Sequence, residues 1–309
     1  MKKLVLIAAA VAAIASCAKV ETINTAGSQQ IAFEGYNFGM TKTTKAFNGE
    51  LGVYASKNAD GNTYFTNTKF TKKAEGQYAG DRYWPTTGTL DFTLYAPYNA
   101  GTTTTRYGVT SIEALPQATD FLYGESVLSG KQSSDGILPI VLKHAKCMVV
   151  VNVQCPSAKL FQVTKVDFGN QGLTGKVAVT YTEAANGAKA TTTWTTTPAN
   201  FNFTKDYVIS AANTPEEYGN ALLIPSDTPI APPTTRKIST ITVDYGMKDG
   251  TNDSYNTLQK VIDLSQSPIT LEEGKKYIFN LTFSANEILF NPSVEDWTEV
   301  TGGVQDQTI

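Results

Sequence analysis

The stretch that decides the fold is Leu90-Asp91-Phe92-Thr93-Leu94-Tyr95-Ala96-Pro97. Apolar residues occupy every second position, alternate with Asp91, Thr93 and Tyr95, and end at a proline. A period of two residues is that of a β-strand with one buried face. The stretch therefore predicts a half-buried strand.

Similar apolar runs recur along the chain, separated by turn residues. The 43 threonines, 15 tyrosines, 14 phenylalanines and 24 glycines also favour strands and turns. About a dozen strands at such spacing are typical of sandwiches and barrels, so we expect an all-β fold. Besides residues 90–96, the expected strands are residues 29–38, 51–55, 137–142, 147–153, 161–168, 176–181, 207–211, 220–224, 238–245, 258–264, 275–284 and 287–290.

The length of 309 residues predicts two domains. Single hydrophobic cores stop growing near ~250–300 residues, so a chain of this length is more readily divided between two domains than packed around one core. We place the division near His144, at the join between two expected strands. The predicted domains are residues 46–144 and 145–309, each an antiparallel β-sandwich.

Charge and residue types exclude several functions. The 25 basic and 28 acidic residues give a net charge of −3, which provides no general basic surface for nucleic acid. One histidine, His144, and three cysteines are too few for a His/Cys metal cluster. No phosphate loop, nucleophile elbow or zinc-protease motif occurs, so we expect no cofactor and no enzyme. Trp194, within a threonine-rich stretch, is the tryptophan that we would test for ligand contact.

Residues 1–16 have the features of a signal peptide. Two lysines precede an apolar run at residues 4–13, which is too short to span ~30 Å of hydrocarbon. Ile14-Ala15-Ser16-Cys17 resembles the bacterial lipobox, in which the cysteine thiol receives a diacylglycerol. We therefore predict lipidation of Cys17, which would hold the protein on a membrane without a spanning helix. The alternative is an ordinary secretory signal with an incidental cysteine.

Two segments beyond the signal peptide lie on either side of the main series of expected strands. Residues 29–38 predict a first strand whose apolar points are Ile31, Phe33, Tyr36 and Phe38, followed by a polar basic link that contains Lys42 and Lys45. Residues 298–309 follow Trp297 and carry three scattered apolar residues, Val300, Val304 and Ile309. Either this second segment is an additional strand or it is a frayed tail.

Several short segments together resemble the fimbrillin family of Bacteroidetes, which are pilus subunits assembled from lipoprotein precursors. The resemblance rests on five elements in a fixed order. They are the lipobox; Ile31-Ala32-Phe33 before Lys45-Ala46 and Leu51-Gly52-Val53-Tyr54; Tyr83-Trp84-Pro85 with residues 90–97; Leu138-Pro139-Ile140 through His144 to Val153; and Leu271-Glu272-Glu273-Gly274-Lys275-Lys276-Tyr277 with the closing Asn291 to Trp297.

The resemblance implies two transthyretin-like domains in tandem and polymerisation by strand exchange. In such pilins a protease removes the first strand of an outer-membrane lipoprotein, and a C-terminal segment of a neighbouring subunit fills the groove. Transferred to this chain, residues 17–45 are the lipidated leader with the removable strand, and Val300, Val304 and Ile309 belong to the donor tail. The family's cleavage arginine is replaced by Lys45, with Lys42 as the second choice.

This departure leaves two interpretations open. Either the protein is a pilus subunit whose partners are copies of itself or other subunits, or it keeps its first strand and lipid. In the second case it would be a non-polymerising outer-membrane adhesin or carbohydrate-binding module, with a host glycan or protein as partner. Both interpretations place the protein on the cell surface, at the outer membrane or in a fimbria.

Overall fold

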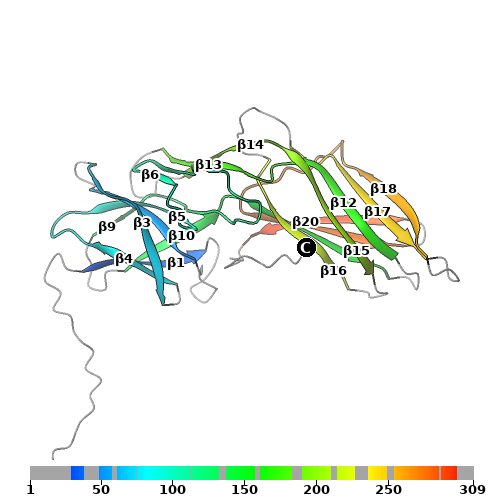
Figure 1. Cartoon of the computed structure of the whole chain (residues 1–309), viewed down its shortest axis with the longest axis horizontal. Coiled ribbons are helices and arrows are strands. Elements are labelled where there is room, and N and C mark those ends of the chain that lie inside the picture. Colours follow the sequence, from blue (N-terminus) through cyan, green and yellow to red (C-terminus); the bar gives the residue numbers. More distant parts are fainter. Residues whose placement is uncertain are drawn as a thin grey trace, which may run out of the picture.

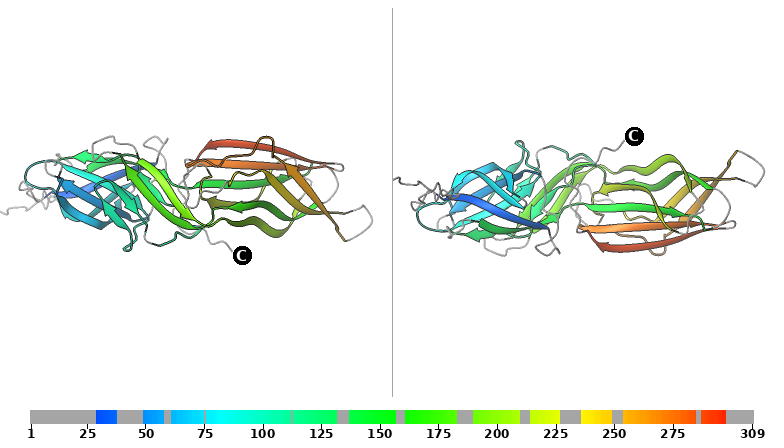
Figure 2. Two further views of the ribbon diagram at one scale, coloured as in Figure 1. Left: turned by 90° about the horizontal axis from the view of Figure 1, so that it is seen from above. Right: turned by 90° about the horizontal axis from the view of Figure 1, so that it is seen from below.

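The computed structural model describes residues 29–37, 49–57, 61–74, 76–111, 113–131, 137–156, 161–182, 190–209, 214–226, 236–248, 254–284 and 287–297. Within these residues every regular element is a β-strand. The molecule is long and narrow, with the early strands at one end and the late strands at the other (Figures 1 and 2). No helix in the described residues is long and apolar enough to cross a membrane. The predicted all-β class is therefore confirmed.

The N-terminal end is an eight-stranded sheet that closes on itself. Its strand order is β2-β3-β4-β1-β10-β8-β5-β9, and β2 also pairs with β5. A closed sheet has few free edges and surrounds its own core. The strands are β1 (Gln30–Asn37), β2 (Leu51–Lys57), β3 (Thr63–Ala74), β4 (Gln77–Tyr83), β5 (Leu90–Ala96), β8 (Leu122–Gly124), β9 (Leu128–Gly130) and β10 (Ile137–His144).

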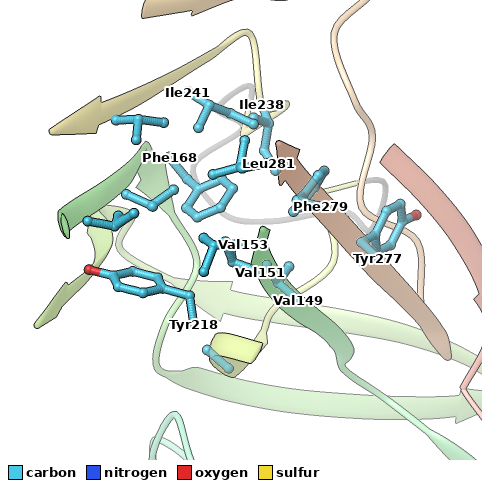
Figure 3. Packing of buried hydrophobic residues seen from close by; sticks show 14 of the residues in the cluster. Val149, Val151, Val153, Phe168, Tyr218, Ile238, Ile241, Tyr277, Phe279 and Leu281 are labelled. Atoms are coloured by element: carbon cyan, nitrogen blue, oxygen red, sulfur yellow. The ribbon is translucent and has the colours of Figure 1, made fainter. Parts of the chain in front are cut away.

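The C-terminal end is a sandwich of two four-stranded sheets. One has the order β16-β11-β19-β20 and the other β15-β12-β17-β18. Valines of β11 and aromatic residues of β12 and β19 meet between the two sheets, as Figure 3 shows. The strands are β11 (Cys147–Gln154), β12 (Phe161–Gln171), β15 (Ala199–Ile209), β16 (Glu216–Leu223), β17 (Thr240–Met247), β18 (Asn256–Asp263), β19 (Lys275–Phe283) and β20 (Ile288–Asp296).

A fourth sheet lies between the two ends of the molecule (Figure 1). Its order is β14-β13-β7-β6, formed by β6 (Thr103–Thr105), β7 (Gly108–Thr110), β13 (Gly175–Tyr181) and β14 (Ala190–Thr196). The hairpin β13–β14 follows residue 145 in the chain, yet β13 pairs with β7, through Val179 opposite Val109. Strands from both predicted domains therefore build this sheet, while the division at 144/145 stays a prediction.

The expectation of purely antiparallel sheets is wrong in two places. Strand β1 runs parallel to β10, and β11 runs parallel to β19. Parallel neighbours need a long connection, and here each pair is separated by many intervening strands. The alternation of side chains reports which face of a strand is buried but not the direction of its neighbour, so the sequence could not reveal this.

Candidate functional site

The most unusual structural position in the chain is that of β1. The expected strand 29–38 is found at Gln30–Asn37, and it lies inside the closed sheet with a neighbour on each edge. Residues 32–37 pair in parallel with β10, from Ala32 opposite Ile137 to Asn37 opposite Leu142. Residues 30–34 pair with β4, with an irregularity between Gln30 and Ala32. Loss of β1 would therefore expose unpaired backbone groups on both β4 and β10.

Two side chains of β1 point into the core of the closed sheet. Ile31 and Phe33 are both fully buried. The ring of Phe33 lies 5.2 Å from that of Phe70 and 5.2 Å from that of Phe92, the second in an edge-to-face arrangement. Such aromatic pairs add about 0.5–1.5 kcal/mol each to the effect of burial. Phe33 is thus the main apolar anchor of the strand.

The start of β1 is held by polar contacts to β4 and the residues after it. The side-chain amide of Gln30 donates to the carbonyl of Gly80 at 2.7 Å. The backbone amide of Trp84 donates to the carbonyl of Gln29 at 2.9 Å. Trp84 in turn packs edge-to-face on Phe92, at 5.7 Å. The polar and apolar contacts of β1 therefore converge on the same aromatic cluster, formed by Phe33, Phe65, Phe70, Trp84 and Phe92.

A second feature involves Trp297, the last described residue. It lies where the closed N-terminal sheet meets the C-terminal sandwich. Trp297 is buried and stacks on His144, the last residue of β10, with ring centroids 3.7 Å apart. Its backbone amide donates to the carbonyl of Gly274 at 2.9 Å. These contacts fix the last described residue, Trp297, at the junction.

Polar groups surround this stack. The Nδ1 atom of His144 lies 3.0 Å from a carboxylate oxygen of Asp120. The Lys146 side chain is buried and donates to the carbonyls of Pro116 and Gln117, at 2.8 and 3.1 Å. Burial lowers the pKa of Lys146 to about 8, an effect that the nearby Asp120 carboxylate opposes. The sequence indicated His144 as a junction residue, but nothing in it pointed to Asp120 or to burial of Lys146.

A carboxylate links three parts of the chain at the same junction. Glu273 accepts hydrogen bonds from the Tyr123 hydroxyl of β8 and the Thr192 hydroxyl of β14. Burial, with the neighbouring Glu273 charge, raises the pKa of Tyr123. The expected strand 275–284 is found at Lys275–Phe283, and Gly274, with a φ of 68°, makes the turn immediately before it. The turn also holds the closed sheet against the C-terminal sandwich.

Residues 40–297 match the sequence model of the family described as Fimbrillin-like. The chain belongs to the fimbrillin-like family. A comparison with curated proteins found no match.

Solved structures share the fold of this fimbrillin-like chain. A fimbrial protein from Bacteroides vulgatus aligns with a TM-score of 0.51 at 16% identity, over 87% of this chain and 100% of the other. A candidate cell adhesion protein from Bacteroides ovatus aligns with a TM-score of 0.53 at 16% identity, over 87% and 98%. A similar protein from Bacteroides uniformis gives 0.51 at 17%, also over 87% and 98%. At these identities the likeness concerns the fold.

The other predicted site residues of the fimbrillin-like chain fall into two groups. The backbone of Tyr36 pairs with Val141 in β10, but its side chain lies outside the described residues. Cys17, Phe38, Lys42, Lys45, Val300, Val304 and Ile309 also lie outside them. Lipidation, cleavage and donation by the tail therefore stay predictions.

The candidate ligand contact at Trp194 is wrong. Its side chain is fully buried, and the Lys146 ammonium lies 5.9 Å from its ring centroid. Burial alternates along strand β14. Thr192, Trp194 and Thr196 are buried, whereas Thr191, Thr193 and Thr195 are exposed. The β-branched threonine suits both faces of a strand, and β14 is an edge strand of its sheet. Among the described residues no group of three or more His, Cys, Asp or Glu side chains could hold a metal.

Proposed function

We propose that this fimbrillin-like chain is a structural subunit of a cell-surface pilus. It is exported as an outer-membrane lipoprotein acylated at Cys17 and polymerises after proteolytic removal of β1, by donor-strand exchange. The observation that carries the proposal is that β1, the first described strand, occupies an internal position between β4 and β10. The family match begins at residue 40, after this strand.

Removal of β1 would leave a groove that favours binding of another strand, for two physical reasons. Unpaired amides and carbonyls on β4 and β10 require backbone partners, and the space vacated by Ile31 and Phe33 requires apolar side chains. A strand from another subunit supplies both the backbone hydrogen-bond partners and the apolar side chains. In this proposal residues 298–309, with Val300, Val304 and Ile309, are the segment that the subunit donates, and adhesion is a property of the assembled pilus.

Processing is proposed at Lys45, with Lys42 as the second choice. The first arginine after the signal peptide is Arg82, which lies within β4 and not in the link. The processing enzyme in this proposal therefore accepts lysine. We also infer that the two ends of the molecule derive from transthyretin-like domains in tandem, and that the protein has no catalytic role.

The alternative is a lipid-anchored adhesin that keeps β1. The burial of Ile31 and Phe33 favours it, because an intact β1 completes the closed sheet. Mass spectrometry of the N-terminus in purified surface filaments separates the two. A mature start at Ala46 supports the pilus subunit, whereas acylated Cys17 in every surface form supports the anchored adhesin.

A further inference from the structure

We propose that the strand that replaces β1 comes from a different pilus subunit and not from residues 298–309 of a second copy. This inference rests on the proposed function and concerns the identity of the neighbour. The partner strand carries a branched aliphatic residue and, two positions away, an aromatic residue. The subunit is then part of a mixed pilus, in which it receives a strand from one kind of protein and donates its own to another.

The site that β1 fills is shaped by aromatic side chains. Ile31 and Phe33 are two residues apart on one face, and both are fully buried. The Phe33 ring packs between Phe70 and Phe92, at 5.2 Å from each. Opposite Phe33 on β4 lies Tyr78, also fully buried, whose pKa burial raises to about 12. The walls of the site are therefore the large aromatic rings of Phe70, Tyr78 and Phe92.

In a pilus built from one kind of subunit, residues 298–309 would have to fill this site. Residues 298–309 contain no aromatic residue. In an extended strand, only residues two apart lie next to each other on one face. Val300 then shares a face with Thr298 and Gly302, Val304 with Gly302 and Asp306, and Ile309 with Gln307. No register places two apolar side chains where Ile31 and Phe33 lie.

The mismatch between residues 298–309 and this site is large. The best registers place one aliphatic side chain in one position and glycine, threonine or glutamine in the other. Removal of a buried aromatic or a large aliphatic side chain leaves a cavity that the surrounding structure closes only in part. On that basis residues 298–309 should bind the groove at least about 100-fold more weakly than the β1 sequence. The Gly302-Gly303 pair adds a further entropic cost of ordering.

A competition experiment on the full chain tests this inference. A specific protease site is inserted in the link between β1 and β2, and the N-terminal segment carries a fluorophore. After cleavage, unlabelled peptides compete for the groove, and release of the label is measured by size exclusion and fluorescence. The peptides are residues 29–38, residues 298–309, and residues 298–309 with the substitutions V300I and G302F. A fourth peptide, residues 29–38 with I31T and F33G, is the matched loss-of-function control.

We expect residues 29–38 and the V300I/G302F peptide to release the label, and the unmodified 298–309 and I31T/F33G peptides to be at least about 100-fold weaker. Release by unmodified 298–309 within about tenfold of residues 29–38 would overturn the inference and leave the proposed function intact. If no peptide releases the label, including residues 29–38, strand exchange itself fails. That result would overturn the proposed function together with the inference that rests on it.

Discussion

Strands β1 and β11 occupy the same kind of position in the two ends of the molecule. Each lies between one parallel and one antiparallel neighbour, β10 and β4 for β1, and β19 and β16 for β11. Their surroundings differ. Strand β11 is buried on both faces from Cys147 to Val151, whereas the alternate side chains of β1, Gln30, Ala32 and Glu34, are exposed or half-buried.

Chain connectivity differs as well. Strand β11 follows β10 directly and continues into β12, so the rest of the fold lies on both sides of it in sequence. Strand β1 precedes all other described strands, and a single cut after it would separate it from them. Two strands with the same pairing thus differ in what a single cut does: it separates β1 from the other described strands, but it cannot separate β11. The difference arises from one-sided burial and from position in the chain.

The largest expected effect comes from the anchor of β1. Phe33→Ala removes a fully buried ring that packs against Phe70 and Phe92. We expect it to lower the free energy of unfolding of the closed sheet by about 3–5 kcal/mol. Hydrogen exchange measured by mass spectrometry should show the loss of protection in β1, β4 and β10. The control Glu34→Gln, on the other face, should change stability by less than about 0.5 kcal/mol, and equal effects of both variants would contradict our assignment of Phe33.

The next largest effect is the contribution of Lys146 to stability, at the junction between the closed sheet and the C-terminal sandwich. The folded pKa of Lys146, about 8, lies below the unfolded value of about 10.4. Between these values the unfolded chain binds more protons than the folded one, so this group makes stability rise with pH through that window. The rise should be about 3 kcal/mol and should be absent below about pH 8.

Urea unfolding of wild type and Lys146→Met, from about pH 7.5 to about pH 10.5, isolates this contribution. Groups that do not interact with Lys146 titrate equally in both proteins, so the difference between the two curves reports Lys146 together with its neighbours Asp120 and Cys147. A wild-type curve parallel to that of the variant would show that Lys146 is not held in the buried environment described.

A smaller effect is expected in β11. Val151→Ala removes two buried methyl groups from the sandwich core, at a cost of about 2 kcal/mol. The loss of hydrogen-exchange protection should stay within β11, β16 and β19. An equal loss in β1 would show that the two ends unfold as one unit and would remove the contrast between the two strands.

The smallest effect is expected at the start of β1. Gln30→Ala removes one side-chain hydrogen bond to the carbonyl of Gly80, which is worth about 0.5–1.5 kcal/mol. The exchange rate of a cleaved, labelled β1 should rise by about tenfold at most. A larger increase would mean that Gln30 rather than Phe33 holds the strand in place.

The sequence predicted single strands well and their partners poorly. The predicted half-burial of β5 is wrong, because Asp91, Thr93 and Tyr95 are buried too, and Tyr95 packs in a cluster with Val109 and Val179 of the fourth sheet. Alternation nevertheless located β5 and β1 to within a residue or two. It missed β3, in which Phe65 and Phe70 are both buried although they are five residues apart. The reason is local: Asn67 has a φ of 35° and the pairing with β2 shifts between Val53 and Ala55, so the period of two is broken.

Long-range contacts could not be predicted from the sequence for a different reason. The closure of the sheet through β2 and β5, the stack of Trp297 on His144 and the contact of Tyr123 with Glu273 join residues far apart in sequence. Local patterns contain no information about such pairs. The sequence indicates a first strand at residues 29–38, but only the fold shows which neighbours that strand has.

A disulfide lock tests most directly whether β1 leaves the fold. Ala32 of β1 and Ala79 of β4 are paired directly across antiparallel strands, a spacing that suits a disulfide. The variant A32C/A79C is produced in cells that build the pilus, with A32C as control, and incorporation into filaments is measured with and without reductant. We predict that the oxidised variant folds but stays out of filaments until it is reduced. Incorporation of the oxidised variant at the level of A32C would contradict the account.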